Sequence, residues 1–166
     1  MISIQTATLQ DLPTIRQIAF QTWPATFGEI LSPSQIEYML DMMYSNNSLK
    51  GQIEQKNHVF LLAKLDEEAV GYASYELDYG GQPKTKIHKI YLLPACQGKG
   101  VGAALFKKIE EIAIENKNDT LTLNVNRYNR AVGFYEKIGF EIVGQEDIDI
   151  GQGFLMQDFI MEKKIG

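Results

Sequence analysis

The stretch Gln97-Gly98-Lys99-Gly100-Val101-Gly102 stands between a β-rich run and an amphipathic run. The preceding run, Ile87 to Leu93, stops at Pro94, which has no N–H to donate to a sheet ladder. We therefore predict a strand that turns across the glycines into the start of a helix. The run after the glycines has the spacing of such a helix, with apolar side chains at Val101, Leu105, Ile109 and Ile112.

The glycines at this turn favour an anion. At a helix start the first backbone N–H groups have no partners and the helix dipole is positive. The missing side chains at Gly98, Gly100 and Gly102 let a phosphate approach the main chain, and Lys99 adds a charge. The Walker loop and the dinucleotide fingerprint both differ from this spacing. The stretch predicts a phosphate or pyrophosphate site, with a plain turn before a helix as the alternative.

Two blocks of the chain resemble the GNAT superfamily of N-acyltransferases. Gln97-x-x-Gly100-x-Gly102 is similar to that family's coenzyme A pyrophosphate loop, Q/R-x-x-G-x-G/A. The run Asn129 to Phe140 resembles its second block, N-x-x-A-x-x-F-Y-x-x-x-G-F, although Asn129 and Ala131 are one residue closer than in the commonest form. A predicted strand, Thr120 to Val125, separates the blocks, which together span residues 85–142.

The resemblance implies acetyl-CoA as a cosubstrate and no metal. Backbone amides at the loop would then hold the pyrophosphate, and the main chain of the preceding strand would bind the pantetheine arm together with Asn129. The implied cofactor-binding residues are Ile90, Tyr91, Leu92, Gln97, Gly98, Lys99, Gly100, Val101, Gly102, Ala103, Asn129 and Tyr135.

By the same resemblance, two groups carry the chemistry. The Leu92 N–H would face the thioester carbonyl as an oxyanion donor. Tyr135 would protonate the leaving thiolate. Each residue also has a structural interpretation, because Leu92 fits a core strand and Tyr135 lies on an apolar helical stripe.

The general base is not assigned by the sequence. Asn124, on the strand before the second block, cannot act as a base. His88, Glu76 and Asp78 are candidates, and a relay through water is the alternative. Cys96 beside the loop has no base paired with it, which disfavours a covalent acyl-cysteine.

Pattern and resemblance together predict one domain, residues 1–166, of the α/β class. The implied fold is a three-layer α/β/α GNAT fold with a mixed, mostly antiparallel sheet of about seven strands and about four helices. The first helix is expected to stop before Pro24, and a second to begin after the cap Ser32-Pro33. A further helical piece is expected around 47–55. The expected strands are Ile2–Ala7, His58–Lys64, Ala69–Asp78, Thr85–Leu93, Thr120–Val125, Phe140–Ile150 and Gly153–Glu162.

Composition limits the partners. Hydrophobic residues make up 45% of the 166 residues, and no apolar run is long enough to span a bilayer. A net charge of -5 without a Lys/Arg stripe disfavours nucleic acid. The single Cys96 and the absence of a secretory pattern favour a reducing cytoplasm. A homodimer is left open.

We therefore expect an N-acetyltransferase that moves an acetyl group from acetyl-CoA to a primary amine by direct attack in a ternary complex. The acceptor is left open between a small amine or polyamine and a protein amino group. Two alternatives are a non-catalytic coenzyme A-binding module and a domain that binds another nucleotide. Aromatic residues that could line an acceptor pocket are Trp23, Phe27, Tyr38 and Tyr44.

A second, shorter resemblance is to bacterial polyamine acetyltransferases of the PaiA type. It rests on Thr26-Phe27 and on Asp158-Phe159-Ile160-Met161. The acidic C-terminal residues would in that case attract a polycation, whereas the alternative is a solvated hairpin face. These residues are Glu146, Asp147, Asp149 and Asp158.

Overall fold

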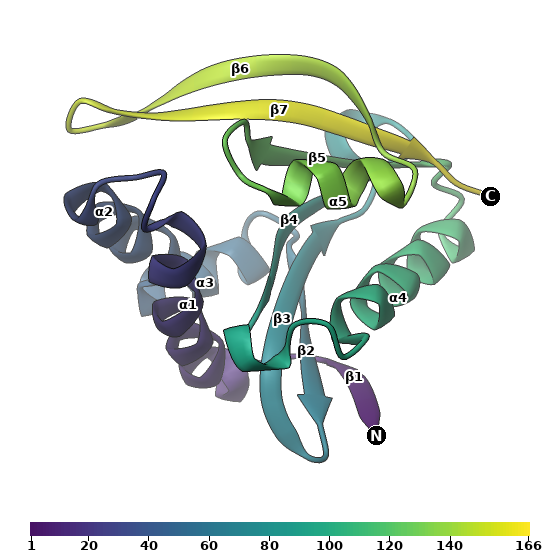
Figure 1. Cartoon of the computed structure of the whole chain (residues 1–166). Helices are drawn as coiled ribbons and strands as arrows, with labels where there is room; N and C mark the ends of the chain where they lie inside the picture. The colour runs from purple at the N-terminus through teal and green to yellow at the C-terminus, as the bar shows by residue number, and fades with distance from the viewer.

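A seven-stranded sheet forms the centre of the protein in the computed structural model, which describes residues 1–166 (Figure 1). Its strand order is β1-β2-β3-β4-β5-β7-β6, and only the β4–β5 pair is parallel. The sheet is therefore mixed and mostly antiparallel, as predicted. The strands are β1 (Ile2–Thr6), β2 (Val59–Leu65), β3 (Glu68–Glu76), β4 (Lys84–Leu92), β5 (Thr120–Asn126), β6 (Glu141–Gly151) and β7 (Phe154–Lys164).

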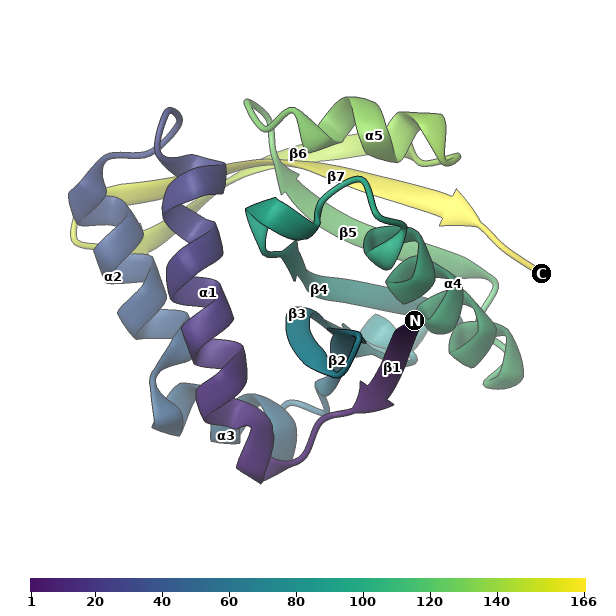
Figure 2. The same cartoon turned by 60° about the horizontal axis from the view of Figure 1, so that its bottom comes forward.

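Helices cover both faces of this sheet, which makes the predicted three-layer α/β/α architecture (Figure 2). There are five helices rather than about four, because the piece expected around 47–55 is a helix in its own right. They are α1 (Leu12–Phe27), α2 (Pro33–Tyr44), α3 (Asn46–Glu54), α4 (Val101–Glu115) and α5 (Ala131–Lys137). None of them has the combination of length and apolar character that crossing a membrane would take.

Two hydrophobic cores lie on opposite faces of the sheet. One packs α4 and α5 against the strands and includes Leu105, Ile109 and Tyr135. The other packs α1, α2 and α3 against the opposite face and includes Trp23, Tyr44 and Leu49. Because side chains alternate along a strand, neighbouring residues of β5 and β7 contribute to different faces.

The sheet opens between β4 and β5. Their parallel pairing covers only Lys84–Ile87 with Thr120–Leu123, although β4 continues to Leu92 and β5 to Asn126. Beyond Ile87 the facing edges of the two strands are not joined by a ladder. The sheet therefore has a gap that can be reached from both of its faces.

The prediction that the first helix stops before Pro24 is wrong. The helix α1 continues to Phe27, and the Gly28 N–H donates to the Pro24 carbonyl. Proline removes one N–H from the helix ladder, but Trp23 and Phe27 are four residues apart on the buried face and are 2% and 6% exposed. Packing of these two rings outweighs the local cost of the proline.

The start of α2 is as predicted. Ser32 is the N-cap, and its hydroxyl accepts a hydrogen bond from the Gln35 N–H at 3.1 Å, with Pro33 in the first helical position. The closing hairpin also forms, and its strands β6 and β7 are each 11 residues long.

Candidate active site

A cavity of about 980 Å³ occupies the gap between β4 and β5. It is lined from one face by α4 and α5, through residues such as Ala103 and Tyr135. From the other face it is lined by α1 and α2, through residues such as Trp23 and Met39. One continuous space therefore connects the predicted pyrophosphate loop with the opposite side of the sheet.

The start of α4 presents free backbone donors to this cavity. The first helical hydrogen bond runs from the Ala104 N–H to the Gly100 carbonyl at 3.1 Å, which leaves the amides of residues 101–103 without backbone partners. Gly98 and Gly100 have φ angles of 79° and 83°, a conformation that glycine adopts without strain. A Cβ at Gly98 would meet nothing within 4 Å, so the loop is open to a ligand.

Five of the seven predicted loop residues line the cavity, namely Gln97, Gly98, Gly100, Gly102 and Ala103. The other two do not. Lys99 is exposed, and the Val101 side chain is fully buried in the core beneath α4. Only the backbone amide of Val101 is therefore available to an anion.

The backbone of β4 also donates into the gap. The Leu93 N–H donates to the Val70 carbonyl on β3 at 2.8 Å, and successive amides along a strand point to opposite sides. The Leu92 and Ile90 amides therefore point away from β3, toward the unpaired side. Both residues line the cavity.

Tyr91 differs from its two neighbours in direction. Its ring belongs to the aromatic group on the α1 face, at 5.7 Å from Trp23 and 5.7 Å from Tyr72 between ring centroids. Burial raises its pKa well above the ordinary value, and the charges of Tyr135 and Asp158 are among the lesser causes.

Tyr135 reaches the cavity from α5. It is 9% exposed and packs edge-on against Phe106 and Phe140, with centroid distances of 5.8 Å to each ring. Burial raises its pKa to about 12, so the phenol stays protonated at neutral pH. A protonated phenol beside a cavity is a proton donor.

Asn129 lines the cavity and serves the start of α5. The helix begins at Ala131 with Arg130 in the cap position. The Asn129 side-chain oxygen still accepts a hydrogen bond from the Ala131 N–H at 2.9 Å. It therefore satisfies a helix-start amide from outside the helix, in the manner of an Asx turn.

Two of the four aromatic residues that were predicted to line an acceptor pocket do so. Trp23 and Phe27 line the cavity, but Tyr38 and Tyr44 do not. The Tyr38 hydroxyl donates to the Ile150 carbonyl, and the Tyr44 hydroxyl shares a 2.6 Å hydrogen bond with Tyr72 inside the core. Tyr38 and Tyr44 therefore stabilise the packing around the acceptor side of the cavity, but their side chains do not line it.

The cavity also contains Asp158, which the sequence predicts only as part of an acidic C-terminal region. This residue lies on β7, is only 3% exposed and lines the cavity beside Asn124 of β5. The prediction of a solvated acidic face is therefore wrong for Asp158, although Asp147 and Asp149 are exposed. The only sequence signal for this position is alternation: the buried Met161 and the partly buried Phe159 pack on the side of α4 and α5, so Asp158 faces the opposite side of the sheet.

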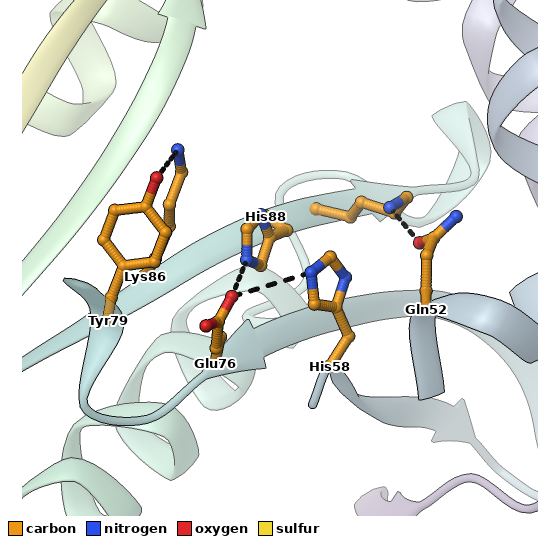
Figure 3. Close-up of polar contacts among 7 residues, drawn as sticks. Gln52, His58, Glu76, Tyr79, Lys86 and His88 are labelled. Atoms are coloured by element: carbon orange, nitrogen blue, oxygen red, sulfur yellow. Dashed lines mark hydrogen bonds and ion pairs between the residues drawn. The ribbon is translucent and has the colours of Figure 1, made fainter. Parts of the chain in front are cut away.

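His58, Glu76 and His88 form a compact polar cluster beside the middle of β4 (Figure 3). The Glu76 carboxylate lies 3.0 Å from His88 Nε2 and 3.7 Å from His58 Nε2, and the two imidazole rings stack 3.8 Å apart. Burial is the main cause that lowers the pKa of His58 to about 4 and that of His88 to about 2, and nearby lysines and, for His88, the His58 ring contribute to these shifts. Both rings are therefore neutral at neutral pH.

This cluster has the residue types of a metal site, with ligand atoms within 4.8 Å of one another. An imidazole binds a metal through a lone pair in its own ring plane, at about 2 Å. Two rings tilted by only 16° and stacked 3.8 Å apart do not direct their lone pairs at one point. In the observed arrangement the cluster is a hydrogen-bonded group.

Of the candidate bases His88, Glu76 and Asp78, only His88 lines the cavity. Glu76 contacts the cavity only through His88. Asp78 lies away from the cavity and binds the Asn118 side chain at 2.8 Å. Cys96 is partly buried and does not line the cavity either.

Comparison with known proteins agrees with this geometry. Residues 29–163 match the family described as the acetyltransferase (GNAT) domain. The chain belongs to the GNAT acetyltransferase family. The GNAT chain is 30% identical over 169 residues to the spermidine N(1)-acetyltransferase of Thermoplasma acidophilum, a match that covers 98% of this chain and 97% of the relative.

A solved structure of a PaiA N-acetyltransferase from Thermoplasma acidophilum in complex with coenzyme A superposes on this GNAT chain with a TM-score of 0.82 at 30% identity, covering 99% of both chains. A shorter match, 39% identical over 61 residues, is to the peptidyl-lysine N-acetyltransferase YjaB of Escherichia coli and covers 36% of this chain and 38% of that protein. The chain is thus an acetyl-CoA-dependent N-acetyltransferase with a PaiA-like fold.

Proposed function

We propose that this GNAT enzyme transfers the acetyl group to a primary amine by direct attack, with both substrates bound at once. The observation that carries the proposal is the single cavity that is lined from both faces of the sheet. Acetyl-CoA enters from the face of α4 and α5, and the amine enters from the face of α1 and α2. The two substrates meet at the gap between β4 and β5, so no acyl-enzyme is needed.

The cosubstrate is held mainly by backbone groups. The free amides at the start of α4 bind the pyrophosphate, whose charge suits the positive end of the helix dipole. Ile90 and Leu92 bind the pantetheine arm through their inward backbone groups, and Asn129 contacts it from the start of α5. Gln97 completes the loop from the end of the preceding turn.

Two groups act on the reacting atoms. The Leu92 N–H donates to the thioester carbonyl oxygen, which becomes more negative as the amine adds. Tyr135 donates its phenolic proton to the departing sulfur. Burial raises the pKa of Tyr135 to about 12, and the same dry surroundings make a thiolate a stronger base, so the proton transfer remains feasible.

We propose a small amine or a polyamine as the acceptor. The relative named for spermidine matches 98% of this chain, whereas the relative named for peptidyl-lysine matches 36% of it. The acidic residues on β6 and β7 near the cavity support a cationic acceptor. A protein amino group is the competing acceptor, and a comparison of amines with lysine peptides as substrates distinguishes the two.

The test is release of free thiol from acetyl-CoA over a panel of amines, polyamines and lysine peptides. The proposal expects release that depends on an amine, with mass spectrometry showing an added acetyl group on that amine. Acetyl-CoA is also expected to raise the melting temperature, while ATP and NAD leave it unchanged. Thiol release that never exceeds the background rate, despite acetyl-CoA binding, would instead identify a non-catalytic coenzyme A-binding module.

We also propose that residues 1–166 act as one domain in the cytoplasm. Both hydrophobic cores pack against the same sheet, which supports a single cooperative unit. The free thiol of Cys96 is the only sulfhydryl and suits a reducing compartment. A single melting transition shared by two spectroscopic probes is the expected result.

A further inference from the structure

Asp158 is a buried carboxylate at the side of the cavity opposite Tyr135. It is 3% exposed and lies on β7, directly across from Asn126 of β5. Its neighbours Phe159 and Met161 belong to the core beneath α4 and α5, so alternation turns Asp158 toward the face of α1 and α2. Asp158 and Tyr135 therefore approach the gap from opposite faces of the sheet.

This carboxylate has little compensation within the protein. Its only hydrogen bond comes from the Asn124 side-chain amide at 3.3 Å, and the same nitrogen donates to Glu146 at 2.7 Å. Asn124 thus divides its two hydrogens between two carboxylates. The shorter bond goes to Glu146, which leaves Asp158 with the weaker one.

The nearby cations are committed elsewhere. Arg127 pairs with Asp147, and the Lys86 ammonium donates to the Tyr79 hydroxyl and sits over that ring (Figure 3). Neither forms an ion pair with Asp158. Burial therefore raises the pKa of Asp158, and Glu146 raises it further, against the lowering effects of Asn124, Lys86 and Arg127.

A buried carboxylate with one weak hydrogen bond is costly unless a cation or further donors join it. An ammonium group supplies a positive charge and three N–H donors. A neutral or anionic ligand supplies no such charge. The chemistry of this wall of the cavity therefore selects a protonated amine.

We propose that Asp158 binds the acceptor as an ammonium ion and then removes its proton, making Asp158 the general base of the transfer. This inference rests on the proposed function, since it assigns the residue that prepares the amine. It also fits the shape of the cavity, because the acid Tyr135 and the base Asp158 lie on opposite walls.

The step balances without any further reactant. One N–H bond of the ammonium breaks, and its proton passes to an Asp158 carboxylate oxygen. The freed nitrogen lone pair forms the N–C bond to the carbonyl carbon. When the C–S bond breaks, its electron pair goes to sulfur, which takes the Tyr135 proton. The acylated nitrogen loses its second proton to solvent as the amide forms, Asp158 gives up its proton to water, and Tyr135 regains one from solvent.

A second candidate base that lines the cavity, His88, is less suited to this role. Its Nε2 faces Glu76 at 3.0 Å and its ring stacks on His58, so the imidazole is already engaged. Three lysines also disfavour a positive charge on it. Asp158 is in the opposite situation, because a cation beside it relieves its burial.

The test compares Asp158→Asn, which keeps the shape and removes the charge, with the wild type. At pH 7, kcat/KM for the best amine of the panel is expected to fall by about 100-fold, while acetyl-CoA affinity stays within about twofold. The deficit should shrink toward pH 10, where a larger fraction of the amine is neutral in solution. Asp158→Glu, which keeps the charge, should recover part of the activity.

The matched control is Asp41→Asn on α2, which removes an exposed carboxylate away from the cavity and is expected to behave as wild type. An Asp158→Asn variant with wild-type kcat/KM, or with a deficit of equal size at every pH, would overturn the assignment. The second result would indicate a purely structural role.

Calorimetry with spermidine separates this inference from the proposed function. Spermidine should bind the wild type at least about tenfold more tightly than Asp158→Asn. A wild type that releases no thiol with any amine removes the proposed function, yet the binding comparison still decides whether Asp158 holds an ammonium group. Equal binding to both proteins contradicts the inference.

Discussion

The two halves of the cavity are built in different ways. The cofactor half, made by the loop Gln97–Ala103, the β4 amides and Tyr135, comes from one stretch of chain and uses mostly backbone groups. The acceptor half, made by Trp23, Phe27, Asn124 and Asp158, combines side chains from three distant elements, α1, β5 and β7. Backbone donors need only the correct turn and small residues, whereas the acceptor half depends on the identity of each side chain.

This difference predicts that a larger side chain at the start of α4 weakens acetyl-CoA binding only by blocking the backbone amides. In Gly102→Val the new side chain would project beside the free amides, and already its Cβ would lie 3.4 Å from the Leu92 side chain. Loss of two hydrogen bonds from backbone amides to the charged pyrophosphate, each worth about 1.5–3 kcal/mol, should lower the affinity for acetyl-CoA by about 100-fold or more. Calorimetric titration with acetyl-CoA measures the change.

The matched control is Gly133→Val on α5, a helical glycine whose added Cβ would meet nothing within 4 Å. Its acetyl-CoA affinity is expected to equal that of the wild type. Equal affinities for both variants would show that the start of α4 does not hold the pyrophosphate, and the comparison between the two halves would lose its basis.

The acceptor half should be sensitive to single polar atoms. Tyr72→Phe removes one partner of the 2.6 Å hydrogen bond with Tyr44, where both side chains are fully buried. The Tyr44 hydroxyl then lacks that partner, and the free energy of unfolding should fall by about 2 kcal/mol. The double variant Tyr44→Phe/Tyr72→Phe should recover most of this loss in a urea titration. A double variant less stable than either single one would contradict the explanation.

In the proposed mechanism, Tyr135 is the one side chain of the cofactor half that takes part in the chemistry. Tyr135→Phe keeps the ring packing against Phe106 and Phe140 but removes the proton donor. Turnover should fall by about tenfold, with acetyl-CoA affinity unchanged. Steady-state kinetics with the best amine gives both values, and an unchanged kcat would remove Tyr135 from the mechanism.

The smallest expected effect concerns stability and pH. Burial raises the folded-state pKa of Asp158, so its ionisation costs more in the folded protein than in the unfolded chain. The wild type should lose stability as pH rises through that pKa, and Asp158→Asn should melt a few degrees higher at pH 7. The difference should shrink below about pH 4, where the carboxyl is neutral in both states. A variant that melts lower at pH 7 would show that the ionised carboxylate is well compensated.

The cofactor half was accessible from sequence because its residues are close in the chain. The glycines, the strand before them and the helix after them are local features, and they predict the loop between strand and helix. The exact start of α5 is harder to predict, because Arg130 rather than the Asn129 of the motif occupies the cap position and helix ends depend on fine local geometry.

The acceptor half was not accessible in the same way. Whether α1 stops at Pro24 is decided by packing of Trp23 and Phe27 on the sheet, which no local rule contains. The depth of Asp158 is decided by its pairing with β5, since an acidic residue in a hairpin is usually solvated. The stacking of His58 on His88 joins the residue just before β2 to a residue of β4, beside a register shift in the β3–β4 pairing.

The strand β6 is the outermost strand of the sheet beside the acceptor half. Its register with β7 shifts at two points, between Ile142 and Gly144 and between Asp149 and Gly151. Four of its side chains are acidic: Glu141, Glu146, Asp147 and Asp149. A second molecule that added its own β6 here would meet an interrupted row of amides and set carboxylates against carboxylates. The long hairpin can therefore stay open to solvent at the mouth of the cavity without seeding aggregation of the protein.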